Sequence, residues 1–138
     1  MPLKEYRIEF KGYWREENKA GIPAESGIYC VYTCLFNRNN QEVSVTKLVY
    51  VGAAENVNDK IATHEKLAEW KGYLDYGEQL CYTFGAVPSA DRARCVAAII
   101  FTHHPPANTD YLLKFPFEKT ILSLTGYTPM LRSIFMVG

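Results

Sequence analysis

The sequence predicts a small α/β domain of the α+β kind, with helices packed on a mostly antiparallel sheet. Three observations predict this class. Strand-like and helix-like segments alternate in the order β-β-β-α-β-α-β-β. Short alternating or apolar runs of strand length are separated by Gly, Pro and Asn turn signals. The length of 138 residues, 48% of them hydrophobic and 22% charged, suits a single globular domain over residues 1–138.

The N-terminal half is predicted to hold three strands. Residues 6–12 alternate between apolar and charged side chains, which indicates a half-exposed strand. After a loop over Arg15–Ser26, the segment Gly27–Phe36 is rich in β-branched and aromatic residues. The run Asn-Arg-Asn-Asn at 37–40 predicts a turn, so Val43–Val51 is expected to return as the second strand of a hairpin.

Two helices are predicted in the remainder. Asn56 is a suitable N-cap for a helix from Val57 to about Leu74. A second helix is expected from Ala90 to about Thr102, because its apolar residues recur at i, i+3, i+4 and i+7. The other strand-like runs are residues 80–84, 119–124 and 130–137.

The charge balance, the N-terminal residues and the length of the apolar runs argue against some classes of function. Lys+Arg and Asp+Glu both number 15, so the net charge is zero, whereas proteins that coat DNA are usually basic. Nucleic acid is then expected to bind only on a locally positive face. The first 14 residues lack a signal-peptide pattern, and no apolar run approaches the ~20 residues of a membrane span. We therefore expect a cytoplasmic protein with no membrane partner.

The four cysteines, at positions 30, 34, 81 and 95, lie in apolar segments and form no Cys-x-x-Cys pair. They are interpreted as reduced, buried, small hydrophobes. A zinc site is the weaker alternative, because Cys30 and Cys34 on one strand face are separated by ~13 Å.

One ordered set of residues points to chemistry. Gly27-Ile28-Tyr29 opens one strand, and Tyr50-Val51-Gly52 closes the next. Asn56, Lys60 and His64 follow at four-residue intervals, and Pro105-Pro106-Ala107-Asn108 follows the second helix. Over about residues 22–108 this frame resembles the GIY-YIG nuclease superfamily.

The resemblance implies an endonuclease that hydrolyses phosphodiester bonds, most simply of DNA, with Mg²⁺ or Mn²⁺. Tyr29 would act as the base, with Tyr50 beside it. Lys60, where the family has Arg, and His64 would contact the phosphate, and Asn108 would brace the site. A base, a cation and a metal are what this hydrolysis requires.

Two further expectations concern the first helix. His64 lies four residues after Lys60, so the two side chains are expected to share one helix face. Lys60 and the N–H donors at Asn56 would form the nucleic-acid contact. Lys60 offers a point charge, not the bidentate fork of Arg, which weakens the grip on a phosphate group.

The metal position departs from the family pattern. In the family a Glu lies nine residues before the proline, and counting back from Pro105 reaches Val96. Valine cannot coordinate Mg²⁺, which demands oxygen ligands, so the sequence names no metal ligand. Val96 also fits the apolar stripe of its own helix. The nearest carboxylates that would substitute in sequence are Glu25, Glu65 and Glu69.

Three functions follow from these observations. The first is a metal-dependent endonuclease, whose catalytic competence depends on the missing ligand. The second is a noncatalytic module that binds nucleic acid through the same frame. The third is a protein-interaction domain, in which the apolar strands after Phe115 form an interface such as a homodimer edge.

Overall fold

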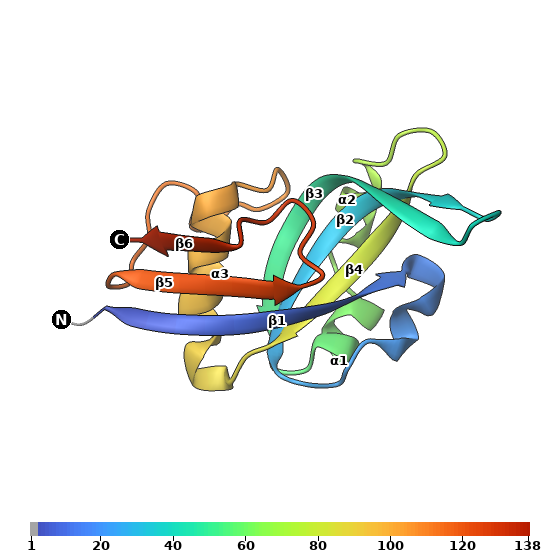
Figure 1. Ribbon diagram of the computed structural model, residues 1–138. Coiled ribbons are helices and arrows are strands. Elements are labelled where there is room, and N and C mark those ends of the chain that lie inside the picture. Colours follow the sequence, from blue (N-terminus) through green and yellow to red (C-terminus); the bar gives the residue numbers. More distant parts are fainter. Residues whose placement is uncertain (1–2) are drawn as a thin grey trace.

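Six strands form one curled sheet in the computed structural model, which describes residues 3–138 (Figure 1). The strand order is β3-β2-β4-β1-β5-β6, and every pairing is antiparallel except the parallel pair β1–β5. The mostly antiparallel α+β architecture is thus confirmed. The strands are β1 (Lys4–Arg15), β2 (Gly27–Asn37), β3 (Glu42–Ala54), β4 (Gln79–Ala86), β5 (Thr120–Gly126) and β6 (Ile134–Val137).

Helices cover both faces of the central strands. The longest, α3 (Ser89–His103), packs over one face, on a core that includes Ile28, Cys30 and Tyr32 of β2. The alternate β2 residues Tyr29 and Val31 face a second core. That second core is covered by α1 (Val57–Ala62) and α2 (Leu67–Lys71), and a 3-10 helix, η1 (Glu16–Gly21), leads into β2. Burial on both faces explains why β2 is a continuous apolar run.

The predicted helix from Val57 to Leu74 is wrong, because the segment is broken into α1 and α2. Thr63 leaves the helical region, with φ of −137° and ψ of 49°. His64 turns inward, and its Nδ1 accepts a hydrogen bond of 3.0 Å from the Lys66 backbone N–H. Such local side-chain to backbone bonds compete with helix continuation. Lys60 and His64 therefore do not share a helix face.

The interpretation of all four cysteines as reduced is also wrong. Cys34 on β2 and Cys81 on β4 form a disulfide between neighbouring strands. Cys30 and Cys95 are free and buried in the core beneath α3. The pairing arises from the order of the strands in the sheet, which the spacing of the cysteines in the chain does not reveal.

Other boundaries shift for local reasons. The last strand begins at Ile134 instead of residue 130, because Met130 has φ of 62°, which extended backbone excludes. The predicted interface on the strands after Phe115 stays a prediction. It has an exposed apolar edge, since Ile134 and Met136 of the edge strand β6 are 64% and 60% exposed. No helix within residues 3–138 is long and apolar enough to cross a membrane.

Steric contacts explain why glycine stands at positions 27 and 52 of the two tripeptides. Gly52 lies directly opposite Tyr29 in the β2–β3 ladder, and a Cβ at Gly52 would collide with the ring carbon Cζ and the hydroxyl of Tyr29. A Cβ at Gly27 would collide with the backbone carbonyl of Gly85 on β4. The two glycines therefore let a tyrosine side chain and a neighbouring strand approach the backbone closely.

We predict that Gly52→Ala destabilises the fold by about 1–3 kcal/mol, because Tyr29 must leave its position. An alanine in a strand would otherwise be favourable relative to glycine. The measurement is urea unfolding followed by circular dichroism. Gly21→Ala is the control, since its Cβ would meet only the Trp14 side chain, at 3.2 Å. Equal stability of the Gly52→Ala and wild-type proteins would contradict the steric argument.

Candidate functional site

Tyr29, Tyr50 and His64 form one aromatic cluster on the face of the sheet that α1 and α2 cover. The Tyr29 and Tyr50 ring centroids are 6.2 Å apart, and both rings lie about 6 Å from the His64 ring, at 5.8 and 6.0 Å. Trp70 of α2 packs behind the cluster, with its ring centroid 4.3 Å from that of His64. The structure thus brings together the two tyrosines and the histidine that the sequence singled out.

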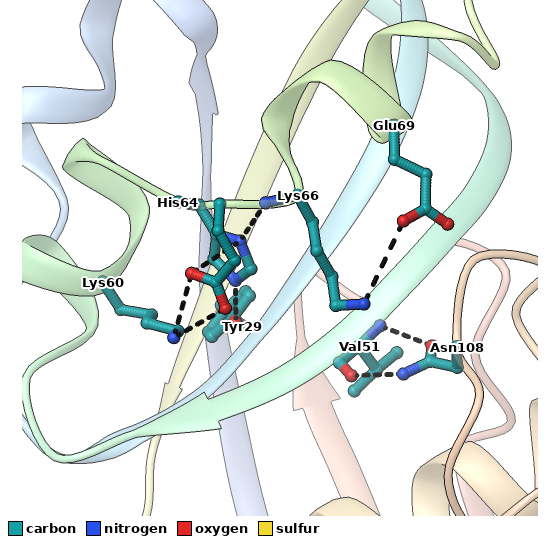
Figure 2. Close-up of polar contacts among 8 residues, drawn as sticks. Tyr29, Val51, Lys60, His64, Lys66, Glu69 and Asn108 are labelled. Carbon is teal, nitrogen blue, oxygen red and sulfur yellow. Dashed lines mark hydrogen bonds and ion pairs between the residues drawn. The ribbon is translucent and has the colours of Figure 1, made fainter.

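A directed chain of hydrogen bonds runs through this cluster (Figure 2). The Lys66 N–H donates to Nδ1 of His64, so in the neutral ring the proton lies on Nε2. Nε2 is 2.8 Å from the Tyr29 hydroxyl oxygen and therefore donates to it. Because Tyr29 is buried, its O–H is then left to donate onward to Tyr50.

Burial fixes the protonation states. It lowers the pKa of His64 to about 4, although Glu65 beside it acts in the opposite direction. The pKa of Tyr29 rises far above its usual value of 10, first through burial and then through Tyr50 and Glu65. Burial and nearby carboxylates, with Glu65 foremost, also raise the pKa of Tyr50. At neutral pH the cluster is a neutral imidazole beside two protonated phenols, a state that favours donation over the phenolate base that the resemblance implies.

Two lysines flank the cluster, and each is paired with a carboxylate (Figure 2). Nζ of Lys60 is 3.3 Å from Glu65, and Nζ of Lys66 is 4.0 Å from Glu69. Lys66 also lies 5.8 Å from the centre of the Tyr50 ring. Both pairs lie towards solvent, so their attraction is weak and an anion can compete for the lysines.

Asn56 has a structural task in this arrangement. Its side-chain oxygen accepts a 3.1 Å hydrogen bond from the Asp59 N–H, which confirms it as the N-cap of α1. The cap satisfies a backbone donor that the sequence had assigned to an incoming phosphate. A role of Asn56 in nucleic-acid binding therefore stays a prediction.

Asn108 braces the site by bonding to the backbone of the edge strand β3. Its side-chain oxygen accepts from the Val51 N–H and its amide donates to the Val51 carbonyl, both at 2.9 Å. The Ala107 N–H donates to the Val49 carbonyl. The loop after α3 thus pairs with β3 almost as a further strand would, next to Tyr50 and Gly52.

A pocket of about 220 Å³ opens beside Tyr50, and Val96 lines it. Val96 is only 8% exposed, and Ile100, one helical turn further on, lines the same pocket. The rim carries Lys66, Asp110 and Tyr111. The predicted metal position is therefore an apolar surface inside a pocket.

The donor set does not fit Mg²⁺ or Mn²⁺. Within residues 3–138, no group of three or more His, Cys, Asp or Glu side chains is placed to hold a metal ion. Of the substitute carboxylates, Glu65 and Glu69 pair with lysines, and Glu25 lines a different pocket beside Pro88. Asp110, which the sequence did not single out, is the one described carboxylate that lines the Val96 pocket. Proteins usually hold Mg²⁺ with one or two carboxylates together with waters and substrate phosphates, so Asp110 alone supplies the minimum and has no second described carboxylate beside it in the lining.

Comparisons with protein-family models, with curated proteins and with solved structures gave no significant match to this chain. The resemblance to the GIY-YIG superfamily therefore stays a prediction carried by the motif residues. In the structure, Gly52 leaves room for Tyr29, His64 bonds to Tyr29, and Asn108 bonds to Val51.

We predict that stability falls as the pH drops from 6.5 to about 4, in part because His64 is buried in its neutral form. Between these values the unfolded state binds a proton at this histidine and the folded state does not, which favours unfolding. The full effect is at most about 3 kcal/mol.

The measurement is urea unfolding at several pH values for the wild type and for His64→Gln, which should lose stability less steeply over this window. Burial also lowers the pKa of His103, so this histidine adds to the pH dependence of both proteins. The difference between the wild type and His64→Gln isolates the contribution of His64. Identical slopes in the two proteins would contradict the buried, neutral state of His64.

Proposed function

We propose that this protein binds the phosphodiester backbone of nucleic acid, in the first instance DNA, at the Tyr29–Tyr50–His64 cluster. The observation that carries the proposal is the direction of the hydrogen bonds from Lys66 through His64 to Tyr29. This direction leads from the buried Tyr29 to the half-buried Tyr50, whose hydroxyl is then left to donate to a ligand. The oxygens of a phosphate group only accept hydrogen bonds.

The charges around the cluster support the same ligand. Lys60 and Lys66 stand on either side of it, each already close to a carboxylate. A phosphate group would replace Glu65 and Glu69 as the partner of these lysines without requiring new cations. Because the chain as a whole is neutral, we expect few phosphate contacts and modest affinity.

Hydrolysis of the phosphodiester bond is the second candidate function, and the Tyr29–His64 hydrogen bond favours it. Phenol and imidazole are both groups that general acid–base catalysis uses. In the tautomer assigned above, Nε2 of His64 carries a proton, so His64 would accept the Tyr29 proton only after a change of tautomer. Val96 and the pocket around it do not supply the oxygen ligands for a divalent cation. We therefore propose binding as the function of the chain with valine at this position, and metal-dependent cleavage as a capacity that one carboxylate would restore.

We predict that Glu65→Gln binds DNA more tightly than the wild type, because Lys60 loses its competing partner. Lys60→Gln should bind less tightly and reduce the slope of log affinity against log salt by about one. The measurement is fluorescence anisotropy of a labelled oligonucleotide over a salt series. Glu9→Gln, an exposed carboxylate change on β1, is the matched control. The proposal fails if neither Lys60→Gln nor Glu65→Gln changes the affinity.

We predict that Val96→Glu gains binding of Mn²⁺, measured by calorimetry, and metal-dependent nicking of supercoiled DNA. The new carboxylate would line an open pocket beside Tyr50 and so keep contact with solvent. Val96→Gln is the isosteric control and should gain neither property. Tyr29→Phe added to Val96→Glu should abolish nicking while leaving Mn²⁺ binding in place. If Val96→Glu binds Mn²⁺ but cuts no DNA, the hydrolysis candidate is wrong.

A further inference from the structure

We propose that the pocket floored by Val96 is a subsite for a nucleobase. It would hold the base of an unpaired nucleotide whose phosphate lies at the Tyr29–Tyr50–His64 cluster. The inference rests on the proposed function and names its substrate class as single-stranded or locally unpaired nucleic acid.

The pocket has the size and the apolar floor that a nucleobase requires. The pocket measures about 220 Å³, on the order of seven water molecules by their share of liquid volume. That volume admits one planar heterocycle. Its floor is formed by the apolar side chains of Val96 and Ile100. The rest of the lining is mostly polar, with Asn108, Thr109 and Asp110 beside the β3 backbone. An apolar surface for the ring face with polar groups around it is suited to a flat heterocycle.

One wall of the pocket is the outer edge of β3, where backbone N–H and C=O groups are free of a partner strand. In an antiparallel pair, alternate residues turn their N–H and C=O away from the partner strand. The bonds of Val51 to Asn108 show that this residue points to the outer edge of β3. Ala53, two residues further along β3, turns its N–H and C=O to the same edge and lines the pocket.

A donor and an acceptor from one residue match the paired acceptor and donor along the edge of a nucleobase. Within residues 3–138, no hydrogen bond from a loop or side chain reaches the Ala53 backbone. The edge of the base would therefore meet unused partners. This wall gives the pocket a preference for a ring with hydrogen-bonding groups over a plain hydrocarbon.

The rim joins the pocket to the Tyr29–Tyr50–His64 cluster. Tyr50 belongs to both, since it packs near Tyr29 and lines the pocket. Tyr111 stands on the rim in the left-handed region, with φ of 60°. Strained backbone of this kind clusters at ligand sites. Aromatic rings at a pocket mouth provide stacking surfaces for a base of any sequence.

The recessed pocket also favours unpaired nucleic acid over a duplex. A base within a duplex is stacked and paired, so it reaches a recessed pocket only after it leaves the helix. Lys66 on the rim is placed to contact the backbone of the same nucleotide, whereas Asp110 would repel a second phosphate there. One nucleotide, with its phosphate near Lys66 and its uncharged base in the pocket near Asp110, is compatible with both charged side chains.

The test compares three ligands of equal length by anisotropy: a single strand, the same strand with abasic sites, and a duplex. We expect the single strand to bind about tenfold more tightly than the other two. If the single strand and the abasic strand bind equally, the base subsite is wrong and the phosphate proposal stands. If none of the three binds, the phosphate proposal itself fails.

Two pocket variants locate the effect. Val96→Phe fills the floor, and it should lower the affinity for the single strand to that for the abasic strand without changing the latter. Thr109→Phe covers the pocket from an exposed rim position, so it serves if the core variant does not fold. Ile134→Phe on the exposed edge of β6 is the matched enlargement away from the pocket. Retention of the full single-strand preference by folded Val96→Phe or Thr109→Phe would overturn the proposal.

A base and a phosphate group could come from a free nucleotide or from a nucleic-acid strand. Binding of a deoxynucleoside monophosphate distinguishes these two ligands. We expect it to bind at least tenfold more weakly than the single strand, because it lacks the neighbouring phosphates. Equal affinity for the monophosphate and the strand would overturn the assignment to a nucleic-acid strand.

Discussion

The two hydrogen bonds between the Asn108 side chain and the Val51 backbone are the contact on which the site depends. They attach the loop after α3 to β3, the strand that supplies Tyr50 and Gly52. One end of the pocket wall is thereby fixed to the sheet and the other to the helix that carries Val96. The loop must end α3 first, which it does through His104 in the left-handed conformation followed by two prolines.

Close packing then sets the character of the cluster. Gly52 gives Tyr29 room against the backbone, and burial keeps the Tyr29 phenol and the His64 ring uncharged at neutral pH. The charged groups, Lys60, Lys66 and their carboxylate partners, all lie around the outside. The site is therefore a neutral, directional donor surrounded by exchangeable ion pairs. This arrangement supports the proposed binding of an anion.

The sequence predicted what depends on neighbours in the chain. The hairpin of β2 and β3 and the N-cap at Asn56 follow from local patterns, and the structure has both. The apolar stripe expected on α3 is right only in part, because Ala93, its first residue, is exposed and every residue from 95 to 100 is buried. The meeting of Tyr29 and Tyr50 was also predictable, because both tripeptides lie near one end of a hairpin. These features need only strand alternation and turn chemistry.

The remainder depends on tertiary contacts. The break between α1 and α2 arises because His64 satisfies both Tyr29 and the Lys66 backbone, which outweighs the helical propensity of the segment. The Cys34–Cys81 disulfide requires β4 to lie beside β2, and the order of segments alone does not fix this. Asp110 lines the pocket from the loop that Asn108 attaches to β3. No local signal marked that residue.

The Asn108 side chain also affects what the β3 edge offers to a strand of another molecule. A sheet edge with open donors and acceptors is a template for strands of other molecules, and it promotes aggregation unless something occupies it. Ala107 and Asn108 occupy the β3 edge at Val49 and Val51 with a loop that cannot continue as a strand. The opposite edge, β6, carries the exposed apolar side chains of Ile134 and Met136. The two edges of the sheet therefore differ: the loop occupies the β3 edge at Val49 and Val51 and leaves Ala53 open, whereas the β6 edge presents exposed apolar side chains.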